Sequence, residues 1–158
     1  MAFQSQVHLY TCEGVAGDPA TPDQAVYTPI NYLAGSGGVD AGSFAFPHTS
    51  SGGIAVAVGD GQPLGIVQRN LSYPNYTVTN EGTLHIAEGD ALTIAVKGDF
   101  WMVAPSSATV GQKLYVDNTS GTISLNSAGA TVSGSTETTW AVKTPADSGG
   151  MMIVSNWE

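Results

Sequence analysis

Nucleophilic catalysis by a thiol is the first chemistry to consider, because the chain has a single cysteine, Cys12, together with His8, His48 and His85. A thiol nucleophile needs a base within reach and surroundings that lower the pKa of the thiol. The neighbouring Glu13 would raise that pKa instead. No Gly-x-Ser-x-Gly motif offers a serine in its place. We therefore predict no catalytic residues and interpret Cys12 as a small packing residue.

Paired carboxylates could act as a general acid and base, or could bind a calcium ion. Glu88 and Asp90 flank Gly89, while Asp60 and Asp99 each follow a glycine. Both patterns are more typical of a turn than of a catalytic or calcium-binding site. The acidic residues lack the spacing of a calcium loop, and the three histidines lack a metal-binding spacing. The sequence therefore predicts a protein without a metal or a cofactor, and not an enzyme.

The charge balance excludes further classes of partner. The 158 residues include 13 acidic residues and only 4 lysines and arginines, which gives a net charge of −9. A protein that binds nucleic acid needs a basic stripe to neutralise phosphates, and four scattered cations do not make one. Binding to nucleic acid or to an anionic membrane is therefore not expected. The beginning of the chain resembles no signal peptide, and no apolar run approaches the roughly 18 residues of a membrane span.

The elements that would position any site are short strands. From Ile54 onward, apolar runs of strand length recur at intervals of about 8–12 residues, with glycine and aspartate turns between them. The runs are 54–58, 64–68, 83–86, 91–96, 100–103, 113–116, 122–125, 139–142 and 151–154. No window of helix length holds a helical apolar period. This pattern predicts an all-β domain over 54–158, either a sandwich or a barrel, and 126–138 is predicted to be a mobile loop.

Residues 1–53 differ, being rich in glycine and proline with widely spaced apolar residues. Two interpretations stay open: an extended, irregular N-terminal arm that orders on a neighbouring subunit, or a loop-rich flank packed on its own domain. In the first case, deleting the residues before Gly53 should leave a folded protein that no longer binds its partner.

Aromatic and apolar side chains are the candidate contact residues. Trp101 and Trp140 lie in apolar runs and are predicted to belong to the core, whereas Trp157 is a better candidate for an intersubunit contact. The predicted contacts to a capsid or to another subunit are Phe3, Val15, Tyr27, Tyr32, Phe44, Phe46 and Trp157.

Several motifs are similar, in the same order, to those of a known family. They are Gly14-Val15-Ala16-Gly17-Asp18, the segment 38–46, the segment 63–69, Gly98-Asp99-Phe100-Trp101-Met102-Val103 and the segment 108–115. Together they resemble the structural cement (capsid decoration) proteins of tailed bacteriophages. The resemblance implies a compact β-barrel of the tulip-like decoration type, with no catalytic residues.

The resemblance also implies a location and partners. The protein would be made in the cytoplasm of the host bacterium and then bind the outer surface of the phage head. It would stabilise contacts between major capsid protein subunits, as a homotrimer at threefold or quasi-threefold positions of the virion.

Other functions remain as alternatives. A carbohydrate-binding β-sandwich would use the aromatic residues as a sugar platform, and a tail or baseplate structural protein would share the strand-rich pattern. A small trimeric hydrolase with its site between subunits would need an acid, a base and a nucleophile, which the sequence does not supply.

Overall fold

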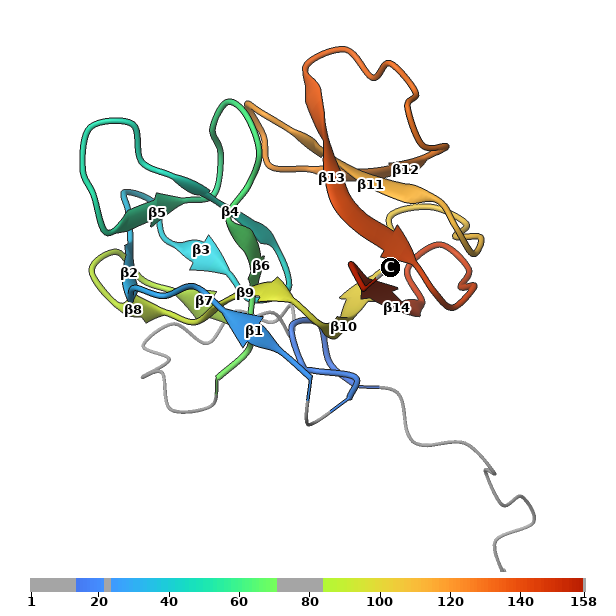
Figure 1. Ribbon diagram of the computed structural model, residues 1–158, viewed down its shortest axis with the longest axis horizontal. Coiled ribbons are helices and arrows are strands. Elements are labelled where there is room, and N and C mark those ends of the chain that lie inside the picture. The colour runs from blue at the N-terminus through green and yellow to red at the C-terminus, as the bar shows by residue number, and fades with distance from the viewer. Residues whose placement is uncertain (1–13, 22–23, 71–83, 158) are drawn as a thin grey trace, which may run out of the picture.

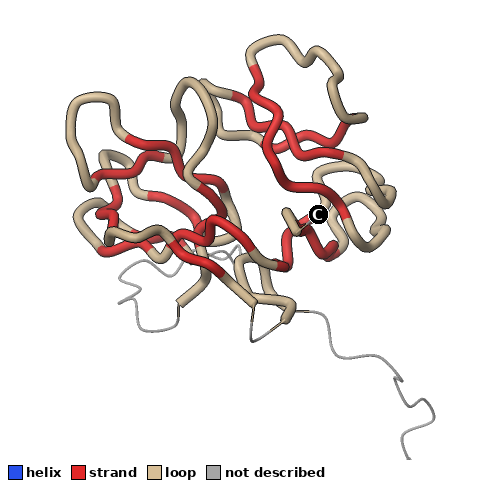
Figure 2. The backbone as a smooth tube through the Cα atoms, viewed as in Figure 1, coloured by secondary structure: helices blue, strands red, loops and turns tan. Residues whose placement is uncertain are grey.

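The computed structural model describes residues 14–21, 24–70 and 84–157. Within these residues the chain forms strands joined by turns and loops, without a helix (Figures 1 and 2). The strands are β1 (Val26–Tyr27), β2 (Tyr32–Ala34), β3 (Val39–Asp40), β4 (Phe44–Pro47), β5 (Ile54–Val56), β6 (Gly65–Val67), β7 (His85–Ile86), β8 (Ala91–Leu92), β9 (Ile94–Lys97), β10 (Asp99–Val103), β11 (Lys113–Asp117), β12 (Ile123–Asn126), β13 (Ser135–Val142) and β14 (Met151–Ser155). The predicted all-β class is confirmed.

The strands are arranged in three sheets rather than in a barrel. A seven-stranded sheet has the order β1-β9-β6-β4-β5-β2-β8, a five-stranded sheet has the order β10-β14-β13-β11-β12, and β3 pairs with β7. Both larger sheets end in edge strands, so the predicted compact barrel is wrong. Closure needs strands long enough to tilt and stagger around an axis. The strands of the seven-stranded sheet have only two to four residues, and the chain leaves that sheet at Gly98.

The main hydrophobic core lies between the two larger sheets (Figure 1). Phe44 and Phe46 of β4 and Phe100 of β10 point into it, because side chains along a strand alternate between its two faces. Trp140 of β13 is buried among them, with its ring edge-on to Phe44 at 6.4 Å and to Phe100 at 6.0 Å between centroids. The prediction that Trp140 belongs to the core is confirmed.

A second core cluster buries the other face of the seven-stranded sheet. Ala45, Val67 and Ile94 alternate with the residues that face the main core, and they pack together with Val39 of β3 and Ile86 of β7. The centre of this sheet is therefore buried on both faces. For this reason its central strands consist of consecutive apolar residues, and polar and apolar residues do not alternate along them.

Strands on the two sides of residue 53 pair with one another. β4 pairs antiparallel with β6, β1 pairs antiparallel with β9, and β2 lies parallel to β5. Residues 26–47 of the predicted arm therefore lie within the sheets of the body. Their strands are two to four residues long and are separated by glycine and proline, so they lack the length that marks a strand in a sequence.

The loop predicted over 126–138 is shorter than expected, because β13 begins at Ser135. The turn before it is held by Tyr115, whose hydroxyl donates to Glu137 Oε2 at 2.9 Å, lies 2.9 Å from Ser127 O, and accepts from Ala130 N at 3.0 Å. Burial and the hydrogen bond to the Glu137 carboxylate raise the pKa of the Tyr115 hydroxyl.

Candidate functional site

Exposed apolar side chains gather in the first described residues. Nine large hydrophobic side chains are exposed in the described part of the chain, and five of them lie between residues 15 and 33. These five, called the apolar edge here, are Val15, Val26, Tyr27, Ile30 and Leu33, and they are 41–50% exposed. They are close in the sequence and lie on β1, on β2 and in the segments beside them, and large apolar side chains exposed in this way are candidates for a contact with another protein.

The sheet holds this edge in place. β1 is an edge strand that pairs with β9, and Thr28 N beyond it donates to Ile94 O at 3.0 Å. Leu33 lies on β2, and its amide donates to Gly53 O at 2.8 Å. The exposed side chains therefore project from backbone that is fixed by hydrogen bonds, which lowers the entropy lost when a partner binds.

The predicted contact residues separate into different environments. Val15 and Tyr27 belong to the apolar edge, whereas Tyr32 is partly buried and packs against the second core cluster. Phe44 and Phe46 are only 1% and 0% exposed, so in this structure they serve the core and offer no surface for a contact. Trp157 is half-buried, and Phe3 lies outside the described residues.

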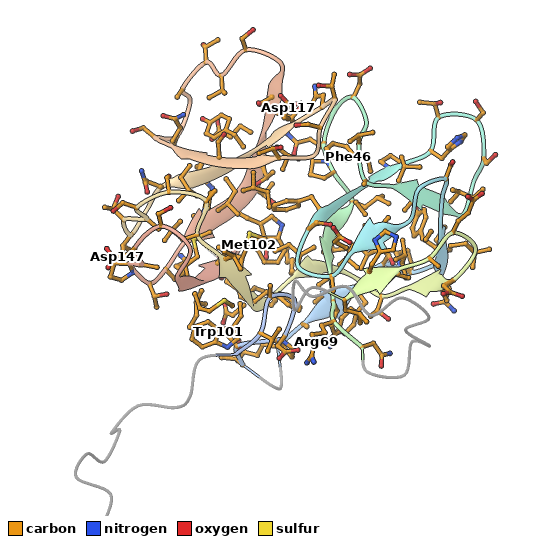
Figure 3. All side chains as sticks on the ribbon, turned by 180° about the vertical axis from the view of Figure 1, so that it is seen from behind. Phe46, Arg69, Trp101, Met102, Asp117 and Asp147 are labelled. Carbon is orange, nitrogen blue, oxygen red and sulfur yellow. The ribbon has the colours of Figure 1, made fainter. Side chains whose placement is uncertain are left out.

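The segment 14–20 forms an extra edge along β10. Gly17 N donates to Trp101 O at 2.9 Å, and Trp101 N donates to Asp18 O at 2.9 Å. Trp101 faces away from the main core and lies against the backbone of Gly14, where a Cβ would be 2.2 Å from Trp101 Cδ1. The prediction that Trp101 is a core residue is therefore corrected: it points to the outer face of its strand and is partly covered by this segment (Figure 3).

A groove of about 400 Å³ lies on the same outer face, at the end of β14. Its lining residues are Ala20, Thr21, Gln24, Asp99, Lys143, Thr144, Ile153, Ser155 and Trp157. Asn156 fixes the chain beside the groove, because its side chain accepts from Gly98 N at 3.1 Å and donates to Val96 O at 2.5 Å. The sequence prediction singled out Trp157 but not the polar residues around it, because they are far apart in the chain.

The ammonium groups of two lysines lie close to Trp157. Lys97 Nζ lies 5.4 Å from the centre of the Trp157 ring, and Lys143 Nζ is 3.5 Å from Trp157 O. Among the described residues, Asp18–Arg69 is the ion pair made by a lysine or arginine, so neither lysine has a carboxylate partner there.

Trp157 Nε1 is buried without a hydrogen-bond partner, the one such side-chain atom in the described part of the protein. A buried donor left unpaired costs about 1–3 kcal/mol.

The described residues contain no group of three or more histidine, cysteine or acidic side chains that could hold a metal ion. His85 Nδ1 lies 2.7 Å from Asp40 Oδ1, which satisfies one ring nitrogen as predicted for a structural histidine. No helix in the described residues could cross a membrane. The described residues thus form an all-β fold, and its exposed apolar side chains are candidates for contacts with other proteins.

Comparison with known proteins identifies the family. Residues 3–156 match the model of the phage family described as "Structural cement protein (E217 gp24/Pam3 gp6)". The match spans nearly the whole sequence, and the chain belongs to this family of phage structural cement proteins. No match is found among curated protein sequences.

Solved structures agree with this fold. One matching chain comes from a structure titled "The capsid of Myoviridae Phage XM1", with a TM-score of 0.60 and 16% sequence identity. The alignment covers 99% of this chain and 98% of that chain. The two chains therefore share a fold over nearly their whole length.

Proposed function

We propose that the protein binds the outer surface of an assembled phage head, where it stabilises contacts between subunits of the major capsid protein. The observation that carries the proposal is the family match over residues 3–156, and the exposed apolar edge supplies a surface for the contact. In this proposal the protein is made in the bacterial cytoplasm and becomes part of the virion.

The stabilisation follows from linkage between binding and assembly. A ligand that binds the assembled lattice but not the separated subunits lowers the free energy of the lattice. For a cement protein, each copy would have to touch two capsid subunits at once. Val26, Tyr27 and Leu33 lie on the seven-stranded sheet and Trp101 lies on the outer face of the five-stranded sheet, so both sheets have partly exposed side chains for such a bridge.

We further propose that three copies act together at threefold and quasi-threefold positions. Copies held together bind with a raised effective concentration, so contacts that are weak singly produce firm attachment. The net charge of −9 favours separate, soluble molecules before assembly, because like charges repel at low salt.

The test is the thermal stability of undecorated capsids with and without the purified protein. We expect bound protein to raise the temperature at which the capsids release their contents. A double variant Val26→Ser/Ile30→Ser should bind more weakly, because it removes two exposed apolar contacts of the edge. The matched control is Val110→Ser, since Val110 is 62% exposed but lies outside the edge. Capsids whose stability and composition stay unchanged after mixing with folded wild-type protein would refute the proposal.

A further inference from the structure

A row of paired side chains leads from the main core to the edge of the seven-stranded sheet. Phe44 of β4 pairs with Ile66 of β6, which pairs with Ala95 of β9. Ala95 pairs in turn with Tyr27 of β1. Residues paired directly across strands point to the same face of a sheet. The first three side chains of the row are at most 1% exposed, whereas Tyr27 is 41% exposed. The row is therefore covered at its centre and uncovered where it ends on β1.

The backbone of Tyr27 also faces the open side of β1. β1 is the last strand of its sheet, and no described strand pairs with its other side. Thr28 N donates to Ile94 O at 3.0 Å, next to the Tyr27–Ala95 pair. When the hydrogen bonds of an antiparallel ladder flank a pair in this way, the N–H and C=O of the paired residues point away from the partner strand. Tyr27 thus offers a donor, an acceptor and an exposed ring to an added strand.

We infer that residues 3–9 of a second copy of this chain pair with β1 as an additional strand, and this inference rests on the proposed function. The segment has the apolar residues Phe3, Val7 and Leu9 at odd positions and polar residues at every even position. Alternation with a period of two is typical of a strand with one apolar face. The segment also contains no proline and no aspartate or glutamate, so it keeps every amide for pairing and adds no repulsion between acidic copies. Its apolar face covers Tyr27 and lengthens the buried row.

The place where this segment joins the described chain favours a second copy as the recipient. Gly14, the first described residue, lies against Trp101 of β10. From there the chain runs along β10 towards β1, with Gly17 N donating to Trp101 O at 2.9 Å. Residues 3–9 of the same copy would have to turn back at Gly14 to reach their own Tyr27, whereas the β1 of a neighbour requires no such reversal. In a ring of three copies, each copy gives one segment and receives one.

Disulfide trapping on capsids tests this pairing. Replacing Cys12 by serine gives a background without cysteine, because Cys12 is the only one in the chain. One protein then carries Val26→Cys on β1, and a second protein, with a tag that changes its mass, carries Gln6→Cys in the segment. Both positions are next to the residues of the apolar contact but on the opposite face, so the contact itself is kept. An equal mixture is bound to undecorated capsids, oxidised and separated without reductant.

We expect a mixed dimer with one chain of each kind, since a disulfide needs Cα atoms about 4.4–6.8 Å apart. Gln4→Cys and His8→Cys, each used in place of Gln6→Cys, cover the neighbouring registers. The matched control carries Val110→Cys in place of Val26→Cys, because Val110 is 62% exposed but does not lie on β1. This control should give no mixed dimer above the background of random collisions.

The outcomes separate this inference from the proposed function. Mixed dimers no more abundant than in the Val110→Cys control, at all three segment positions and with protein bound to the capsids, would overturn this inference alone. If Val26→Ser/Ile30→Ser still binds weakly in that case, the capsid shell occupies the edge instead. A disulfide within a single chain that carries both cysteines, formed in dilute solution without capsids, would assign the edge to the chain's own segment and overturn the inference as well. Wild-type protein that fails to bind capsids would refute the proposed function.

A pair of charge variants tests which face of the segment is buried. Val7→Asp places a carboxylate on the apolar face, whereas Gln6→Asp places the same charge on the polar face. We expect Val7→Asp to bind capsids about fivefold more weakly than Gln6→Asp, because a charge buried without a partner is unfavourable. Both free proteins should melt at the wild-type temperature, since the segment precedes every described strand. Equal capsid binding by the two variants would contradict the inference.

Discussion

Trp140 and Trp101 show how the position of a residue along its strand decides its role. Trp140 is 2% exposed and lies at the centre of the main core, edge-on to Phe44 and Phe100. Trp101 lies between the inward-facing Phe100 and Met102, so its side chain points to the opposite face of β10. The two tryptophans both lie in apolar runs of the sequence. Their burial differs because successive side chains of a strand point to opposite faces, and only Trp140 points into the main core.

Replacement by alanine should therefore have unequal effects. We expect Trp140→Ala to lower the free energy of unfolding by about 3–5 kcal/mol, because it leaves a large cavity in the core. Trp101→Ala should cost only about 1–2 kcal/mol, because the ring is partly exposed already. Urea unfolding of both variants measures the difference. Equal losses would show that Trp101 is as tightly packed as Trp140.

Asp117 makes stability depend on pH through the turn between β11 and β12. Its Oδ1 accepts from the side-chain hydroxyl of Thr119 and from the amides of Thr119 and Ser120, at 2.7–2.9 Å. These hydrogen bonds, that of the Thr119 hydroxyl first, lower the pKa of the Asp117 carboxyl from 3.8 to about 2. The folded state therefore favours the ionised form, and its contribution to stability is full above the ordinary pKa and is lost as the pH falls towards 2.

Urea unfolding, measured from above the ordinary pKa of 3.8 down towards pH 2, tests whether Asp117 causes this loss of stability. The variant Asp117→Asn should lose less stability than the wild type on acidification, because its side chain does not titrate. Asp147→Asn is the matched control, since Asp147 is an exposed carboxylate in the loop before β14 (Figure 3). If Asp117→Asn and Asp147→Asn lose stability equally on acidification, Asp117 is not the residue responsible.

At the scale of elements, the segment 14–20 joins the two larger sheets. It pairs with β10 of the five-stranded sheet, and Gly17 O accepts from the amide of Arg69, beyond β6 of the seven-stranded sheet. The Arg69 side chain also reaches Asp18, at 3.4 Å. Gly17 has a positive φ of 87°, and a Cβ there would lie 2.8 Å from Gly42 N.

Gly17→Ala should therefore release this segment from the sheets. We expect a loss of about 1–3 kcal/mol in stability and a red shift of tryptophan fluorescence as Trp101 becomes more exposed. Gly37→Ala is the control, because Gly37 has nearly the same φ, 85°, but open space around its Cβ. A fluorescence shift of the same size in Gly37→Ala would assign the effect to backbone strain alone.

The strands after residue 54 could be predicted from the sequence, because their apolar runs are long enough and have clear turns on both sides. The prediction failed for β1, β2 and β3, which have only two or three residues and owe their structure to pairing with distant strands. It also failed for Ser135–Thr138, where small polar residues join β13 through ladder hydrogen bonds to β11. Pairing partners distant in the sequence cannot be read from a local pattern.

The candidate site could be predicted only in part, for a related reason. Val15, Tyr27 and Trp157 are apolar residues in or beside irregular sequence, and the structure leaves them partly or largely exposed. Phe44 and Phe46 have the same character in the sequence but are buried, because β4 lies at the centre of its sheet. The two lysines beside Trp157 lie on β9 and in the chain after β13, so only the fold brings them to Trp157.

For the molecule as a whole, the body includes much of the predicted arm. Deleting residues 1–52 would remove β1–β4 and take Phe44 and Phe46 out of the core. We therefore expect that truncation to lose cooperative unfolding, contrary to the expectation from the sequence. Deleting residues 1–13 leaves every described strand in place, so this shorter protein should unfold cooperatively and can be tested for capsid binding. Cooperative unfolding of the longer truncation, followed by circular dichroism, would contradict this account of the core.

A protein that cements a phage head from outside has to bind the outer surface of the assembled capsid. The most direct measurement is electron cryo-microscopy of undecorated capsids before and after mixing with the purified protein. We expect added density on the outer surface at threefold and quasi-threefold positions, into which three copies of this fold can be placed. Capsids without added density, or density confined to the tail in complete virions, would contradict it.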